Sequence, residues 1–469
     1  MKRLLKKIVI GYIFLNLVLA GLFLSAGGLQ MLKQPEIPAV AAPPSLQSDL
    51  KFFHDLVLAN EQGITPEQAA AFTRIVEQAP PPQTADALTL TVLQALAVFD
   101  NAHTTALTTR MFRLPVRFHW TVDGLIIVKA RPEYTQLLGQ RVLSLGGHTP
   151  EDLVTRTALL TGGGTDSWRK YRSEFLLSAP SALSQLGANV EDGAVAVQLL
   201  DPQGSVSTQQ LTADTELMPG DPFWDFRNAF PDDESFDTKG WVSLLHRDEA
   251  LPLYLQESDK LHLLRDIPGH GAIYVRMNAS FADKGESLDQ FEQRILDLAA
   301  GQKPAHFIVD FRYNRGGDYT KVLSIVKSVS SAVPADGRLY LIVGPNTFSA
   351  GIIAASQFKQ RLPHRLTVVG SEIGDSLRFR AEGFYPTLPA SGIQLYLTKA
   401  WTDLVDGCGW LDDCWPPNKL LLKEVGALEV DIPAENTWES YRTRKDLVLE
   451  AVLTDIERQQ AAGDIAGAQ

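Results

Sequence analysis

From about residue 270 onward, the chain alternates between short apolar runs and amphipathic segments. The apolar runs are GAIYVRMN, HFIVDF, RLYLIVG and LTVVG, and the segments between them are SLDQFEQRILDLAAG, YTKVLSIVKSVSS and SAGIIAASQFKQ. Near-continuous apolar strands that alternate with helices are typical of a sheet whose two faces are both covered. This pattern limits the fold more than any other feature of the chain, and it predicts an α/β core.

Four regions precede this core, which we place at residues 216–460. Residues 1–30 are basic and then apolar, and residues 31–48 form a linker rich in proline and alanine. Helical periodicity predicts an N-terminal helical region over residues 49–111. Short β-like runs separated by turn signals predict a β-rich insert over residues 112–215.

The N-terminus begins with the basic stretch MKRLLKK, which is followed by the apolar run IVIGYIFLNLVLAGLFLSAGGL. This run is longer than the about 7–15 residues of a secretory signal core and reaches the about 20 residues of a spanning helix. It predicts an uncleaved signal-anchor that holds the protein at the membrane, with the body outside the cytoplasm. In a Gram-negative bacterium this would be the periplasmic side of the inner membrane. A cleaved signal peptide, and therefore secretion, is the alternative.

Charge and residue counts exclude some classes of function. The net charge is −12 and the body of the chain has no basic stripe, which argues against a nucleic-acid partner. The nine histidines are scattered without metal-ligand spacing, so we expect neither a metal site nor a cofactor.

Two cysteines, Cys408 and Cys414, stand in the short stretch DGCGWLDDCWPP. They can close a small disulfide ring or remain as reactive thiols. No neighbouring histidine or lysine is present to lower a thiol pKa. Export from the cytoplasm favours the disulfide.

Ser349 stands in GPNTFSAG, directly after the predicted strand RLYLIV. A strand that turns sharply into a helix presents a hydroxyl at the helix N-terminus, where free backbone N–H groups and the helix dipole favour negative charge. Ser349 is therefore a candidate nucleophile. The alternative is that Thr347 or Ser349 only caps the helix.

A pair of glycines, Gly316 and Gly317, lies in DFRYNRGGD after another predicted strand. Glycine permits backbone geometries and close approaches that other residues do not. An N–H group of this turn, together with that of Ala350, could stabilise an oxyanion. The alternative is an ordinary tight turn between strand and helix.

His103 lies in FDNAHTT, where a long helical pattern stops. A lone histidine in a loop is most often solvated or placed at a helix C-terminus. Imidazole is nevertheless the side chain that can act as a base near neutral pH without a large change in its pKa. A serine nucleophile needs such a base.

Taken together and in this order, these segments resemble the family of tail-specific (C-terminal-processing) proteases, tricorn core proteases and interphotoreceptor retinoid-binding protein repeats. The similarity lies in D-x-x-H-T at 100–104, D-x-R-x-N-x-G-G at 310–317 and T-F-S-A-G at 347–351. It implies a ClpP/crotonase-like β-α superhelix core with a helical N-terminal cap. The stretch LLGQRVLSLGG is similar to the carboxylate-binding turn of a PDZ domain, which implies a PDZ-like insert.

The resemblance also separates two catalytic branches. The tail-specific branch uses a lysine base in a turn resembling G-E-x-T-x-G-K, whereas this chain has GSEIGD, which ends in Asp375, and the nearest downstream lysine is Lys399. The tricorn-like branch uses a histidine, and His103 is present. The resemblance thus casts Ser349 as nucleophile and His103 as base. It casts the N–H groups of Gly316 or Gly317 and Ala350 as oxyanion donors.

Two departures from the family pattern concern the environment of the base. Tricorn-type sites carry a serine before the histidine, where this chain has Ala102. They also use a later glutamate to complete the site. Glu424 precedes a stretch like the family's P-D-I motif, while Asp375 and Glu372 are nearer in sequence to Ser349. We therefore keep Glu424 and Asp375 as alternative candidates for the acid that orients His103.

The sequence thus predicts a membrane-anchored serine peptidase that cleaves peptides or unfolded protein tails outside the cytoplasm. The alternative is a catalytically inactive member that binds an apolar ligand or a protein partner. A hydrolase acting on esters would use the same residues. Neither substrate identity nor oligomeric state follows from the sequence.

Overall fold

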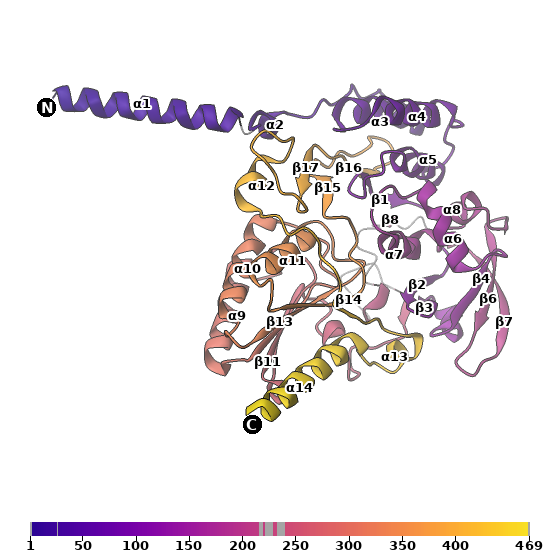
Figure 1. Cartoon of the computed structure of the whole chain (residues 1–469). Coiled ribbons are helices and arrows are strands. Elements are labelled where there is room, and N and C mark those ends of the chain that lie inside the picture. The colour runs from indigo at the N-terminus through magenta and orange to yellow at the C-terminus, as the bar shows by residue number, and fades with distance from the viewer. Residues whose placement is uncertain (1, 26, 215–218, 221–227, 232–239, 468–469) are drawn as a thin grey trace.

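A computed structural model gives the structure of the chain (Figure 1). It describes the backbone except at residues 1, 26, 215–218, 221–227, 232–239 and 468–469. Side chains are also left undescribed at residues 2–10, 30, 219–220 and 463–467.

The core is a six-stranded sheet with the strand order β10-β11-β12-β13-β14-β18. Its strands are β10 (His262–Ile267), β11 (Ala272–Met277), β12 (His306–Asp310), β13 (Arg338–Val343), β14 (Leu366–Gly370) and β18 (Ile432–Pro433). β10 pairs antiparallel with β11, and every later pair is parallel. The predicted α/β core is therefore confirmed.

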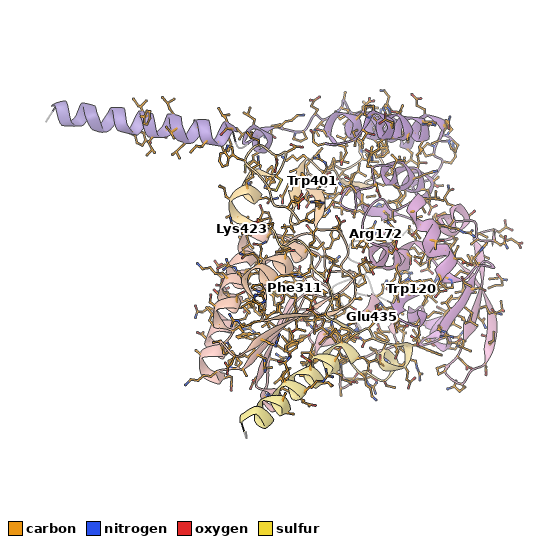
Figure 2. All side chains as sticks on the ribbon, in the orientation of Figure 1. Trp120, Arg172, Phe311, Trp401, Lys423 and Glu435 are labelled. Carbon is orange, nitrogen blue, oxygen red and sulfur yellow. A yellow bond between two sulfur atoms is a disulfide. The ribbon has the colours of Figure 1, made fainter. Side chains whose placement is uncertain are left out.

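Helices cover both faces of this sheet, as the apolar strands require. One face packs against α9 (Leu288–Gln302), α10 (Tyr319–Ala332) and α11 (Ala350–Arg361) through Val309, Leu341 and their neighbours. Alternate residues, among them Ile308 and Tyr340, pack on the other face against α14 (Leu447–Gly467). Figure 1 shows α9–α11 and α14 on either side of the strands. Phe311, labelled in Figure 2, lies in the first of these clusters.

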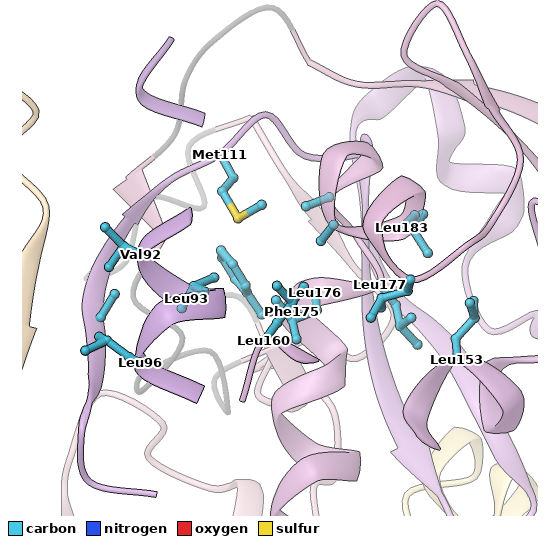
Figure 3. Close-up of a cluster of buried hydrophobic side chains, with 14 of the residues drawn as sticks. Val92, Leu93, Leu96, Met111, Leu153, Leu160, Phe175, Leu176, Leu177 and Leu183 are labelled. Carbon is cyan, nitrogen blue, oxygen red and sulfur yellow. The ribbon is translucent and has the colours of Figure 1, made fainter. Parts of the chain in front are cut away.

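A second body is built from the N-terminal helices and the insert. Its helices are α3 (Leu46–Asn60), α4 (Pro66–Gln78), α5 (Ala85–Ala97), α6 (Pro150–Arg156), α7 (Asp166–Leu176) and α8 (Pro180–Gln185). Its strands are β2 (Val116–Thr121), β3 (Gly124–Ala130), β4 (Arg141–Leu145), β5 (Val190–Glu191), β6 (Ala194–Leu200), β7 (Val206–Thr212) and β9 (Val242–Ser243). Buried side chains of α5, α7 and α8 form one apolar cluster here (Figure 3). The insert thus combines a sheet with helices.

Shorter elements connect the two bodies. They are β1 (Thr105–Arg110), β8 (Pro219–Gly220), β15 (Arg378–Ala381), β16 (Gln394–Tyr396), β17 (Ala400–Asp403), α12 (Pro416–Leu421) and α13 (Trp438–Arg442). β1 lies between β16 and β8 in one small sheet, and β15 pairs with β17 in another. The pairing of β1 with β16 ties the N-terminal region to the segment between the core strands β14 and β18.

The chain begins with α1 (Lys2–Ser25) and α2 (Leu29–Leu32), and α1 extends away from the body (Figure 1). Among the residues that the structure describes, no helix combines the length and the hydropathy needed to cross a membrane. The predicted anchor at 1–30 falls partly on residues 1–10, whose side chains lie outside the described set. Cys408 and Cys414 are joined in a disulfide with a Cα–Cα distance of 6.0 Å.

Arg312, the arginine of DFRYNRGG, anchors α14 to the sheet. Its guanidinium donates two hydrogen bonds of 2.9 Å to the Asp446 carboxylate. It also donates to Asp310, which in turn accepts a hydrogen bond from Tyr274. All these charges are buried, so each carboxylate is needed to offset the desolvation of the arginine.

We expect Asp446→Ala to lower the free energy of unfolding by about 3–5 kcal/mol, because it leaves Arg312 with one buried carboxylate instead of two. Urea denaturation measures the loss. Glu450→Ala, at an exposed position in the first turn of α14, is the control and should change stability by less than about 1 kcal/mol. Equal effects of the two substitutions would contradict the anchoring role.

Candidate active site

Three loops meet at one edge of the sheet because β12, β13 and β14 run parallel and are neighbours. The loop after β12 holds Gly316 and Gly317, the loop after β13 holds Ser349, and the loop after β14 holds Asp375. Backbone hydrogen bonds join them: Phe348 N–H donates to Asn314 O at 2.9 Å, and Gly374 N–H donates to Thr347 O at 2.9 Å. Ligands commonly bind at such an edge.

Ser349 occupies the turn between β13 and α11 with φ = 53° and ψ = −122°. A non-glycine residue in this region costs about 1–3 kcal/mol and usually marks a functional turn. Its side chain makes no capping hydrogen bond to α11. Thr347 is also not a cap, because its hydroxyl donates to Phe311 O and accepts from Gly344 N–H. The helix-capping alternative is therefore wrong.

Gly316 lies directly against Ser349. A Cβ added to Gly316 would stand 2.6 Å from Ser349 Cβ and 3.1 Å from its Oγ. The backbone of Gly316 has φ = +103°, which side-chain-bearing residues rarely adopt. Close approach to the serine therefore requires a glycine at this position.

The candidate oxyanion donors differ in whether their N–H group already donates a hydrogen bond. Gly316 N–H already donates to Asn314 Oδ1 at 3.1 Å, which argues against the predicted oxyanion role of that glycine. Among the described residues, neither Gly317 N–H nor Ala350 N–H has a hydrogen-bond partner. Ala350 is the first residue of α11, where N–H groups lack helical acceptors. Gly317 and Ala350 thus keep donors available at this edge.

His103 reaches the site from the loop between α5 and β1, far away in the sequence. Its ring is stacked between Phe348, at a centroid distance of 4.2 Å, and Phe379, at 5.0 Å. The side chain is 2% exposed. Because Phe348 precedes Ser349, this stacking brings the imidazole beside the serine turn.

Asp375 faces the far side of the imidazole. Its Oδ2 lies 3.5 Å from His103 Nδ1, and both atoms are buried without another hydrogen-bond partner. Its other oxygen accepts from Ser376 N–H at 2.8 Å. A distance of 3.5 Å is longer than a formed hydrogen bond, and such contacts commonly tighten when substrate binds. Asp375 is thus placed to orient His103 and leave Nε2 as the basic nitrogen.

The other predicted partners lie elsewhere. Glu424 is exposed and lies near Gly407, so its proposed role as the orienting acid does not fit the structure. The ammonium of Lys399 lies 5.5 Å from the centre of the Trp415 ring, outside the cavity that holds Ser349. No group of three or more His, Cys, Asp or Glu side chains in the described ranges is arranged to bind a metal ion.

A cavity of about 450 Å³ contains both Ser349 and His103. Its wall also includes Gly316, Gly317 and the side chains of Arg315, Asp318 and Glu382. Apolar and aromatic residues complete the lining: Leu107, Phe281, Tyr319, Tyr385, Tyr396 and Trp415. The cavity can therefore hold an extended ligand next to the serine hydroxyl.

A buried polar network that the sequence did not reveal braces the loop of His103. The Glu61 carboxylate accepts hydrogen bonds from Thr104 Oγ1 at 2.6 Å, Thr398 Oγ1 at 2.7 Å and Thr398 N–H at 2.9 Å. Asn101 adds hydrogen bonds to both threonine hydroxyls. Thr104 follows His103 directly, so this network fixes the backbone that carries the imidazole. The acidic residue comes from the end of α3, and no local pattern marks it.

Comparison with solved structures identifies the fold. A structure of mature CPAF complexed with lactacystin matches with a TM-score of 0.55 and 12% identity, covering 89% of this chain and 98% of that chain. A second structure of mature CPAF matches with a TM-score of 0.53 and 12% identity, covering 85% of this chain and 94% of that chain. The chain therefore has the fold of mature CPAF.

Other structural matches have TM-scores too low to support an inference about the fold. A photosystem II D1 C-terminal processing protease matches with a TM-score of only 0.36 and 13% identity, covering 87% of this chain and 97% of that chain. No family model and no curated protein matches the chain. At 12% identity the likeness to mature CPAF establishes the fold alone, and the evidence on function comes from the geometry of the site.

We expect stability to depend on pH through Glu61. Burial raises the pKa of this carboxyl above its ordinary value, although its hydrogen bonds act in the opposite direction. The folded protein therefore favours the neutral acid, and the stability this group contributes is lost as pH rises through its folded pKa. Glu61→Gln stays neutral, so it should gain stability relative to wild type as pH rises above the ordinary glutamate pKa of about 4. Thermal unfolding at a series of pH values measures this.

Glu61→Ala is the matched disruptive variant. It leaves Thr398 N–H and two hydroxyls without their acceptor, at a cost of about 1–3 kcal/mol. Glutamine can keep the network, because its oxygen accepts from Thr398 N–H while the hydroxyls turn to accept from its amide. Unfolding curves for wild type and Glu61→Gln that stay parallel at every pH would contradict the assignment.

Proposed function

We propose that the chain is a serine peptidase of the tail-specific and tricorn-related family, with Ser349 as nucleophile, His103 as base and Asp375 as the orienting acid. The observation that carries the proposal is the strained, uncapped Ser349 in one cavity with a buried imidazole that faces a carboxylate. The fold shared with mature CPAF supports it. The substrates are peptides or unfolded protein tails.

The chemistry follows from these positions. Ser349 Oγ attacks the scissile carbonyl carbon while His103 Nε2 takes the hydroxyl proton. The negative charge on the former carbonyl oxygen is stabilised by the N–H groups of Ala350 and Gly317. Collapse of this intermediate breaks the C–N bond, and His103 returns the proton to the leaving amine. Water, activated by His103, then hydrolyses the acyl-enzyme and restores Ser349.

We also propose that this body acts outside the cytoplasm. The basic and apolar N-terminus supports export, as does the disulfide between Cys408 and Cys414, because such bonds persist in oxidising compartments. Whether the N-terminal segment is retained or removed after export does not alter the site.

Ser349→Ala and His103→Ala should each lower kcat/KM for peptide cleavage by about 10³-fold or more, and Asp375→Asn by about 10²- to 10⁴-fold, because they remove the nucleophile, the base and the group that orients the base, respectively. Ser349→Ala should also abolish labelling by a serine-directed covalent probe. The measurements are peptide cleavage and mass spectrometry of the labelled chain.

Ser356→Ala is the control for removal of a hydroxyl from the same helix, since Ser356 is buried in α11 away from the cavity lining. It should be labelled and active like wild type. A folded wild-type chain that is neither labelled nor active on peptides or esters would refute catalysis and favour a binding protein.

The export proposal predicts that Cys408 and Cys414 are oxidised in the cells that make the protein. Alkylation of free thiols during lysis, followed by peptide mass spectrometry, should find both cysteines unlabelled until a reductant is added. Recovery of both as alkylated thiols would count against export. The Cys408→Ser variant provides the reference for a free Cys414.

A further inference from the structure

Glu382 presents a carboxylate without a partner to the cavity of Ser349. It lies directly after β15 and lines the same wall as His103 and Ser349. The structure gives its carboxylate no hydrogen bond and no ion pair with any described residue, although the residue is only partly exposed. A carboxylate held in this way is free to accept hydrogen bonds or a charged partner from a ligand in the cavity.

The backbone also holds Glu382 in an unfavourable conformation. Its φ is +53°, a value that favours glycine and is uncommon for a glutamate. The next residue, Gly383, donates its N–H to Tyr396 Oη at 3.0 Å, which fixes the turn against that ring. Strain of this kind persists where the surrounding structure dictates the position, and it is concentrated at ligand sites.

Aromatic rings line the cavity that Ser349 and Glu382 share. The rings of Tyr385 and Tyr396 are stacked at a centroid distance of 4.8 Å, and Tyr396 lies 6.4 Å from the His103 ring. Trp415 and Phe281 line the same space. Such walls accommodate the methylene stem of a long side chain and attract a cation through the ring faces.

The other charged groups around the cavity include both carboxylates and cations. Asp318 is a second carboxylate in the wall, and its charge, after burial, raises the pKa of Glu382 further. Asp318 has partners of its own, because its Oδ1 accepts hydrogen bonds from Thr320 and its Oδ2 lies 3.8 Å from Lys321 Nζ. Arg315 is the lining cation, and it is buried with an interaction of its own. Lys399 lowers the pKa of Glu382, and its ammonium lies 5.5 Å from the centre of the Trp415 ring. Among the described lining residues, Glu382 therefore offers an unpaired carboxylate, which favours a positively charged ligand group.

We propose, on the basis of the proposed peptidase function, that Glu382 determines specificity by pairing with a cationic substrate side chain next to the scissile bond. The stem of a lysine or arginine lies along Tyr385 and Tyr396, and its charged end reaches the Glu382 carboxylate. The substrate class is thus a peptide or protein tail with a basic residue at the cleavage site.

Binding to the full-length Ser349→Ala variant tests this without requiring turnover. The probes are hexapeptides that differ at one central position, with lysine, norleucine or glutamate. Norleucine keeps the lysine stem but lacks the charge. Calorimetric titration should show the lysine peptide binding about tenfold or more tightly than the norleucine peptide, and the glutamate peptide binding most weakly.

Adding Glu382→Gln to the Ser349→Ala variant should remove the preference for the lysine peptide. The affinity for the norleucine peptide should stay within about twofold of its value in Ser349→Ala alone. The matched control is Glu429→Gln, an exposed carboxylate outside the cavity, which should leave the preference unchanged. In the chain that keeps Ser349, the single variant Glu382→Gln should still be labelled by the serine probe, and this labelling would show that the active site is intact.

The outcomes separate the two proposals. Equal binding of lysine and norleucine peptides, or an equal loss for all three peptides with Glu382→Gln, overturns the role of Glu382 even if Ser349 is catalytic. A lysine preference that depends on Glu382 in a chain that cannot be labelled at Ser349 supports the cationic site and refutes the peptidase.

Discussion

The parallel pairing of β12, β13 and β14 is the constraint on which the site depends. Parallel neighbours end at the same edge of a sheet, so the glycine turn, Ser349 and Asp375 meet there although they are separated in the chain. Hydrogen bonds between the three loops then fix their spacing. Helices on both faces bury the strands and keep this edge as the place where polar groups can converge.

The base is held by a different kind of interaction. His103 is sandwiched between aromatic rings, and the loop that carries it is fixed by the buried hydrogen bonds of Glu61. A buried polar network is stable only when its members are satisfied, so it restricts the loop to one arrangement. The imidazole is thus held in place with Nδ1 at 3.5 Å from Asp375, and neither ring nitrogen makes a hydrogen bond with a described residue.

Much of this could be read from the sequence, for physical reasons. The apolar runs and helical spacing predicted the core, and the order of the three motifs placed Ser349, the glycine turn and His103 together. The choice between Glu424 and Asp375 could not be made, because proximity to an imidazole depends on how two loops fold back. Glu61 and Glu382 were missed because neither sits in a motif, and each acquires its role from residues distant in sequence.

By itself, the sequence determined the alternation of strands and helices, and with it the sheet edge at which Ser349 had to appear. Those features depend on periodicity and on turn residues, which act locally. Only the tertiary structure decided which acid faces His103, which glycine N–H makes no hydrogen bond, and which carboxylate remains unpaired in the cavity. Those outcomes depend on burial and on distances between segments far apart in the chain, and no local pattern encodes them.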